Sequence, residues 1–113
     1  MKVLKDPVQA LQIMDKKLDK LRKKFYESED RLEEAEIHGQ EISIICVKNH
    51  ISCAIKRHHS FDEDDMAGVY KYAADTKRNA REYGDLWDTR YMKGRADGAA
   101  WACVGLEDRM EEP

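Results

Sequence analysis

An apolar residue recurs every seven positions through the first third of this chain. The series is Leu4, Leu11, Leu18, Phe25 and Leu32. A second series, offset by three or four residues, is Met14, Leu21, Ser28 and Ala35. Together the two series form a narrow stripe along one side of an α-helix, the pattern of a coiled coil. We therefore expect an all-α protein, either a long helical hairpin or a small three- to four-helix bundle with coiled-coil-like seams.

The first helix is expected over residues 7–38. Asp6 and Pro7 predict its start, because Asp is a favoured cap and Pro loses nothing at the first helical position. From Pro7 to Ile37 it would be roughly 46 Å long at about 1.5 Å per residue, too long for one small domain to cover. Its stripe must pack on a second helix, on a sister chain or on a foreign target. The residues expected in this oligomer or hairpin seam are Leu11, Met14, Leu18, Leu21, Phe25 and Leu32.

Charge is divided sharply along the same segment. From Met1 to Tyr26 eight Lys or Arg face three Asp, a net charge of +5, whereas from Glu27 to Glu41 seven acids face one Arg, a net charge of −6. A rod charged in this way can pair antiparallel with a second copy, although charge is also the ordinary covering of a solvated helix face. We expect a homodimer or higher homo-oligomer. The expected partner surface is Lys16, Lys17, Lys20, Lys23 and Lys24, a face that suits either a protein or a nucleic acid.

The middle of the chain is ambiguous between helix and strand. Gly39 interrupts the first pattern and predicts a turn or a kink. The β-branched run from Ile42 to Val47 suits either a strand or a buried helix. No second strand-like run is present to pair with it, and helical spacing continues to Ile55, so we expect a helix over 41–58.

A third helix is expected over 61–110. Ser60 and Glu63 have the spacing of a capping box. Gly84 is either tolerated within this helix, at about 1 kcal/mol relative to Ala, or ends it, in which case Asp85 caps a fourth helix. We expect continuity, because a lone Gly is a weak stop. The chain would then be a single helical domain over 1–113.

Small residues recur every three or four positions in the last segment, at Gly94, Gly98, Ala102 and Gly105. Such a stripe has almost no side chains and lets another backbone approach closely. We expect a close helix crossing formed by Gly94, Gly98, Trp101 and Ala102.

The run around this stripe is Tyr91-Met92-Lys93-Gly94-Arg95-Ala96-Asp97-Gly98-Ala99-Ala100-Trp101-Ala102. It resembles the Tyr-x-x-Gly-x-x-Asp-Gly-x-x-x-Ala pattern that closes many small, mostly uncharacterised helical proteins of bacteriophages. The resemblance implies a phage accessory protein or inhibitor that acts in the bacterial cytoplasm, often by binding a host or defence protein. It carries over no catalytic residue.

Chemistry-bearing residues do not form a familiar constellation. His58 and His59 are adjacent, so they point to different faces of a helix and cannot aim at one metal ion. Glu29, Glu33 and Glu36 share a face, as a magnesium-dependent all-α nucleotide hydrolase requires, but no matching acidic pair follows. We therefore expect a non-enzymatic interaction protein without a cofactor or a metal. Nucleic-acid binding through the Lys16–Lys24 face is the alternative, and the hydrolase ranks third.

Cysteine usage and hydropathy bear on the compartment. The three cysteines are an odd number without a CxxC pair, so we expect them reduced and mostly buried. No run of eighteen apolar residues and no secretory leader is present, which predicts a cytoplasmic protein without a membrane partner.

Overall fold

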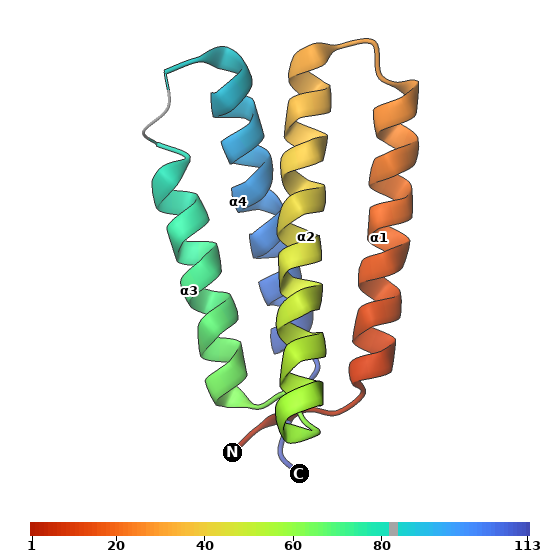
Figure 1. Cartoon of the computed structure of the whole chain (residues 1–113), viewed down its shortest axis with the longest axis vertical. Coiled ribbons are helices and arrows are strands. Elements are labelled where there is room, and N and C mark those ends of the chain that lie inside the picture. The colour runs from red at the N-terminus through yellow and green to blue at the C-terminus, as the bar shows by residue number, and fades with distance from the viewer. Residues whose placement is uncertain (82–83) are drawn as a thin grey trace.

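Four helices run alongside one another in the computed structural model, which describes residues 1–81 and 84–113 (Figure 1). They are α1 (Pro7–Glu27), α2 (Arg31–His58), α3 (Glu63–Asn79) and α4 (Leu86–Glu107). The described chain also has two short strands, β1 (Val3–Leu4) and β2 (Met110–Glu111). The prediction of a small all-α bundle is confirmed.

The helix predicted over 7–38 is two helices, because the chain turns between α1 and α2. Ser28 has an extended backbone that ends α1, and the Asp30 carboxylate accepts a hydrogen bond from the backbone N–H of Leu32 at the start of α2. The seven-residue periodicity does not register this turn, since apolar residues stay in phase across it. The basic and acidic blocks therefore lie on neighbouring helices of one molecule and not at two ends of a rod.

An aspartate caps the start of each described helix, at Asp6, Asp30, Asp62 and Asp85. Its carboxylate accepts from backbone N–H groups that have no partner within the helix. The predicted start at Asp6 and Pro7 is confirmed. The capping box predicted from Ser60 is instead formed two residues later, by Asp62 and Asp65.

The turn or kink predicted at Gly39 is wrong, because α2 continues through this residue and includes the ambiguous run from Ile42 to Val47. The expectation of helix for that run is confirmed, and the helix begins ten residues before the predicted start at Glu41. Gly39 is buried and faces α4. Its role is set by a neighbouring helix, which local sequence does not reveal.

The helix predicted over 61–110 is also two helices. α3 ends at Asn79 and α4 begins after the Asp85 cap, with Gly84 in the connection between them. The expectation of continuity was wrong, and the alternative with Asp85 as a cap is what forms. The part of the prediction that falls on residues 82–83 lies outside the described residues.

Three glycines bring α2 and α4 together at the centre of the fold. An added Cβ would lie 1.9 Å from a carbonyl oxygen of the facing helix at Gly94, 2.6 Å at Gly98 and 2.1 Å at Gly39. Real Cβ atoms essentially never come within 3.0 Å of another atom, so no side chain fits at these positions. The structure thus places Gly94 and Gly98 at a backbone-to-backbone crossing with α2.

Glu36 fastens the same crossing at its edge. Its carboxylate lies 2.7 Å from the Arg90 guanidinium and 2.7 Å from the Lys93 ammonium, so one side chain of α2 holds two cations of α4. Burial raises the pKa of Glu36, but the hydrogen bonds from Lys93 and Arg90 outweigh it and the pKa is lowered. The carboxylate therefore stays ionised in the folded protein at neutral pH.

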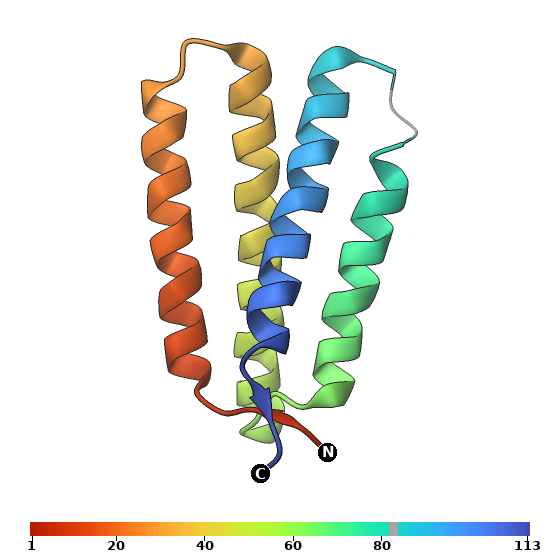
Figure 2. The same cartoon turned by 180° about the vertical axis from the view of Figure 1, so that it is seen from behind.

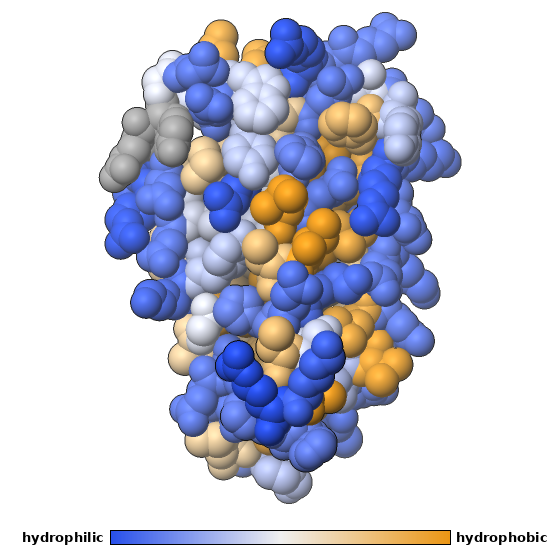
Figure 3. Space-filling view, viewed as in Figure 1, coloured by the Kyte–Doolittle hydropathy of each residue, from blue (hydrophilic) through white to orange (hydrophobic). Residues whose placement is uncertain are grey.

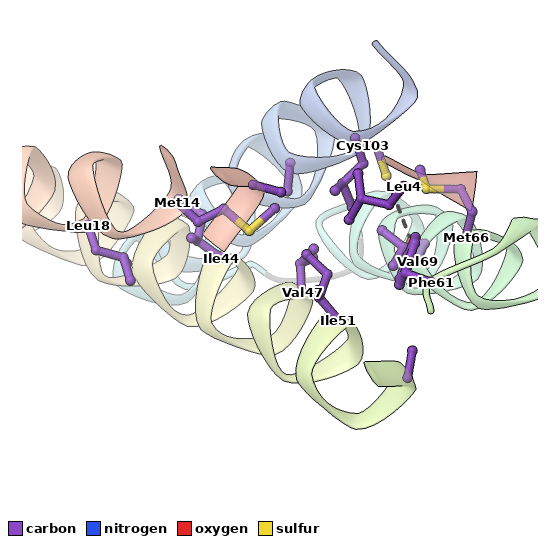
Figure 4. Packing of buried hydrophobic residues seen from close by; sticks show 14 of the residues in the cluster. Leu4, Met14, Leu18, Ile44, Val47, Ile51, Phe61, Met66, Val69 and Cys103 are labelled. Atoms are coloured by element: carbon purple, nitrogen blue, oxygen red, sulfur yellow. Dashed lines mark hydrogen bonds between the residues drawn. The ribbon is translucent and has the colours of Figure 1, made fainter. Parts of the chain in front are cut away.

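Apolar side chains from all four helices form one core cluster, part of which is shown in Figure 4. α2 occupies its centre, since Ile44, Val47 and Ile51 are fully buried. In Figures 1 and 2, α1 and α3 lie on opposite sides of the α2–α4 pair. α1 therefore packs mainly on α2 and has little contact with α4.

The two ends of the chain meet at one end of the bundle (Figure 2). β1 and β2 are antiparallel, with Leu4 opposite Met110, and the backbone N–H of Leu4 donates to the Phe61 carbonyl at 2.8 Å. Both Leu4 and Phe61 are buried. α4 accordingly ends at Glu107 and not at residue 110 as predicted, because the chain after it pairs with the N-terminal strand.

Candidate docking surface

A groove lies between α1 and α4, whose backbones are drawn in orange-red and blue in Figure 2. Its volume is about 530 Å³. The lining is largely apolar, with Ala10, Ile13 and Met14 from α1, and Ala100, Trp101, Ala102, Val104, Gly105 and Leu106 from α4; Asp108 and Arg109 close one end. We call this feature the α1–α4 groove.

Small side chains on α4 keep the groove open. A Cβ added at Gly105 would find no atom within 4 Å, in contrast to the glycines of the crossing. Val104 is 58% exposed although it is apolar. The stripe of small residues predicted in the last segment therefore serves two purposes. Gly94 and Gly98 admit α2, whereas Gly105 leaves a space that no described residue fills.

Trp101 lies in this groove and not at the glycine crossing. Its ring is half-buried, and the Lys17 ammonium lies 5.5 Å from the ring centroid, within the range of a cation–π contact. Ala102, the other residue expected at the crossing, is buried in the core beside the groove. The Lys17–Trp101 contact thus links the predicted basic face to the groove.

The basic face lies on α1, as expected from its sequence. Four of its residues, Lys16, Lys20, Lys23 and Lys24, are exposed, and Lys17 is half-buried. None of the five forms an ion pair with a carboxylate of the described residues, whereas Arg22 lies 3.8 Å from Glu41 of α2. The hairpin therefore uses Arg22 to join the basic and acidic blocks and leaves the five lysines without an acidic partner in the described chain.

The seam predicted on α1 divides between the core and the surface. Met14, Leu18 and Leu21 are buried in the core cluster that α2 completes. Leu11 and Leu32 are half-buried, and Leu32 lies on α2. Phe25 is 36% exposed near the end of α1. The structure thus places Met14, Leu18 and Leu21 in the core of one molecule and leaves Phe25 at its surface.

The groove itself was missed by sequence reasoning. Its α1 wall includes Ile13, an apolar residue that lies outside the heptad series, and its α4 wall includes Ala100 and Val104, apolar residues on the exposed side of a helix. Apolar residues outside the main stripe indicate that some apolar surface stays uncovered, but they do not indicate between which two helices a groove forms.

Two of the three cysteines, Cys46 and Cys53, line a pocket together with His50 and His58, whereas Cys103 belongs to the core. The cysteines are free: Cys103 is buried, Cys46 is half-buried and Cys53 is exposed, so the expectation of burial holds fully only for Cys103. Burial and the nearby Glu107 carboxylate raise the pKa of the Cys103 thiol. Among the described residues, no group of three or more His, Cys, Asp or Glu side chains is arranged to hold a metal ion.

Comparisons with known proteins give no relative. No protein-family model, curated protein or solved structure matches this chain. Within the described residues, no helix is both long and apolar enough to cross a membrane.

Proposed function

We propose that this chain is a non-enzymatic interaction protein that binds one helix of a protein target in the α1–α4 groove. The observation that carries the proposal is an apolar groove left open along a bundle whose other helices are packed together. An amphipathic helix that lays its apolar face into such a groove is a recurring mode of protein recognition. The exposed Val104 and the uncovered Gly105 supply contact area for it.

The charge along the groove defines the helix that fits it. One face of α1 borders the groove. Its residues recur three or four positions apart and are Ile13, Lys17, Lys20 and Lys24. The border is apolar at its first turn and basic over the next two, about 16 Å from Ile13 to Lys24 at 1.5 Å per residue. The complementary helix has apolar anchors at one end and Asp or Glu along the turns that follow.

A protein target also agrees with the resemblance of the C-terminal run to bacteriophage accessory proteins. On this proposal the chain acts in the bacterial cytoplasm as an inhibitor of a host or defence protein. Its effect comes from occupying a surface and requires no catalytic residue. Part of the target's own acidic, amphipathic helix would be covered in the complex.

Two matched variants test the proposal. Val104 lies in the groove and is 58% exposed, whereas Val8 is 64% exposed on α1 and does not line the groove. Exposed substitutions usually change stability by less than about 0.5 kcal/mol, so Val104→Arg and Val8→Arg should both fold. Each purified variant is used to capture proteins from bacterial lysate, and any captured protein is purified and titrated calorimetrically.

We expect a captured acidic protein to bind the wild type and Val8→Arg alike, and to bind Val104→Arg at least tenfold more weakly. A target whose affinity is the same for Val104→Arg and the wild type would contradict the groove as its site. Light scattering addresses the predicted homodimer separately. A dimer that Val104→Arg dissociates would assign the groove to a second copy of the chain in place of a foreign helix.

Nucleic-acid binding is the second candidate, because the five lysines of the basic face have no acidic partner among the described residues. Phosphate contacts of this kind weaken steeply with added salt. A mobility-shift assay at low salt on the wild type and on Lys20→Glu/Lys23→Glu/Lys24→Glu decides this point. We expect no shift with either protein, and a shift that the triple variant abolishes would favour nucleic acid over a protein target.

A further inference from the structure

A second pocket lies near the start of α4, beside the glycine crossing. Its volume is about 370 Å³, and its lining residues are His38 from α2 and Trp87, Asp88, Tyr91, Met92 and Arg95 from α4. It shares no lining residue with the α1–α4 groove. We call it the Arg95 pocket. A partner helix docked in the α1–α4 groove would not contact the residues that line this pocket.

Aromatic rings form one wall of this pocket. The rings of Trp87 and Tyr91 are stacked, with centroids 5.4 Å apart and planes 11° from parallel, and the His38 ring lies 5.7 Å from that of Tyr91. Trp87 is nevertheless 38% exposed. Side chains of intermediate hydropathy, pale in Figure 3, are visible along the face between α3 and α2. A partly exposed stack of this kind is a platform on which a further planar ring can lie.

Arg95 brings a positive charge to the pocket and forms no ion pair with a carboxylate of the described residues. Its Nη2 donates to the Tyr72 hydroxyl at 3.1 Å, and its guanidinium lies 5.8 Å from the Tyr72 ring centroid. Its Nε is buried and has no hydrogen-bond acceptor. The printed contacts of the Arg95 guanidinium are with Tyr72, and no carboxylate of the described residues lies within ion-pair distance of it.

The Arg95 side chain is half-buried, and its buried Nε lacks an acceptor. A buried donor without an acceptor costs free energy. Structures rarely keep an unsatisfied buried group without a reason, and an absent ion or ligand is one such reason. An anion in the pocket would supply a countercharge to the guanidinium, a group that favours carboxylate and phosphate oxygens.

We propose that the Arg95 pocket binds a small planar aromatic molecule that carries one carboxylate or phosphate. The anion pairs with Arg95, and the ring lies against Trp87 and Tyr91. Asp88 lines the same pocket, so it accepts hydrogen bonds from hydroxyl or amino groups of the ligand and disfavours a second anionic group. A pocket of this volume falls in the range of small-molecule sites. The proposal does not depend on the α1–α4 groove.

Tryptophan NMR tests the proposal directly. The chain has two tryptophans, so Trp101→Phe leaves Trp87 as the source of the indole N–H signal. Adenosine monophosphate represents ring-bearing phosphates and 4-hydroxybenzoate represents aromatic carboxylates. We expect at least one of them to shift the Trp87 signal saturably below about 1 mM, a dissociation constant typical of a weak small-molecule site. Inorganic phosphate and adenosine alone should bind at least tenfold more weakly.

Arg95→Met should weaken the bound probe at least tenfold, whereas Arg31→Met, a matched change of an exposed arginine, should leave its affinity unchanged. Arg95→Lys keeps the charge but loses the planar fork, and we expect an intermediate affinity. Saturable binding by neither ring-bearing anion, or equal affinity for Arg95→Met and the wild type, would overturn the proposal.

Thermal melting of Arg95→Met shows whether a loss of binding comes from misfolding of the variant. Because Arg95→Met removes a buried Nε that has no acceptor, the variant should melt at or above the temperature of the wild type while it loses binding. Loss of binding together with a lower melting temperature would identify Arg95 as a packing residue and would also overturn the proposal.

Discussion

Gly94→Ala puts the glycine crossing to a quantitative test. The new Cβ would lie 1.9 Å from the carbonyl oxygen of Glu36, so the backbones of α2 and α4 must separate by about 1.1 Å to reach the 3.0 Å that real Cβ atoms respect. The obstacle is the backbone of Glu36 and not a flexible side chain that could move aside. Overpacking of this kind costs about 1–3 kcal/mol, and we take the upper end because the obstacle is backbone.

Helix propensity offsets part of this cost. Alanine is favoured over glycine within a helix by about 1 kcal/mol, so the net loss expected for Gly94→Ala is about 2 kcal/mol. Gly105→Ala is the matched control on the same helix. Its Cβ meets no atom within 4 Å, so it gains the propensity without the clash and should be stabilised by up to about 1 kcal/mol.

Urea unfolding followed by circular dichroism measures both variants. At a slope of about 2 kcal/mol per molar urea, the midpoint should fall by about 1 M for Gly94→Ala and rise by up to about 0.5 M for Gly105→Ala. A Gly94→Ala protein as stable as the wild type would refute the close approach of α2 and α4, and with it the reason for glycine at this position.

Three further outcomes follow from polar contacts. Ser43→Ala removes a buried hydroxyl that hydrogen-bonds to α4 and α3, and should cost about 1–2 kcal/mol in the same urea assay. Burial raises the pKa of Glu36, but the hydrogen bonds from Lys93 and Arg90 outweigh burial and lower it. The ionised form of Glu36 therefore stabilises the fold above its ordinary pKa of 4.5. This stabilisation is lost as the pH falls through the lowered pKa of the folded state. Urea midpoints measured between about pH 5 and pH 3 should accordingly fall more for the wild type than for Glu36→Gln. Asp30→Ala removes the cap of α2 and should lower stability by about 1 kcal/mol, which thermal melting can detect.

Local chemistry accounts for the parts of the fold that sequence predicts. The Asp6–Pro7 start and the helical reading of Ile42–Val47 rest on neighbours a few residues away, and both hold. The turn before α2 is local as well, since Asp30 is a strong cap residue, but an unbroken heptad phase concealed it. Periodicity therefore located the buried faces better than the ends of the helices.

Tertiary contacts account for what the sequence does not reveal. In the sequence alone, Gly39 cannot be told apart from a glycine in a turn. Only the approach of the α4 backbone explains why it lies inside a helix. Gly105 and Gly98 belong to one stripe by spacing, yet one faces open space and the other faces Gln40. The groove exists because α1 packs on α2 and stands apart from α4, a relation between distant segments that no short pattern encodes.

The two candidate sites differ in how far the sequence reveals them. The basic face of α1 was visible as a run of lysines, and the structure adds the apolar groove that it borders. The Arg95 pocket had no such signal, because its histidine, aromatic residues and arginine come from two helices and are brought together by the glycine crossing.

Site-specific photocrosslinking in bacterial cells tests the proposed groove most directly. A benzophenone amino acid is placed at Val104 in the groove and, as a control, at the comparably exposed Val8 outside it. If the groove binds a target helix, irradiation will give one discrete adduct from position 104 and none from position 8, and mass spectrometry will map it to an acidic, amphipathic helix of another protein. No adduct at position 104, an equal adduct at both positions, or an adduct with the mass of two copies of this chain would contradict binding of a foreign helix in the groove.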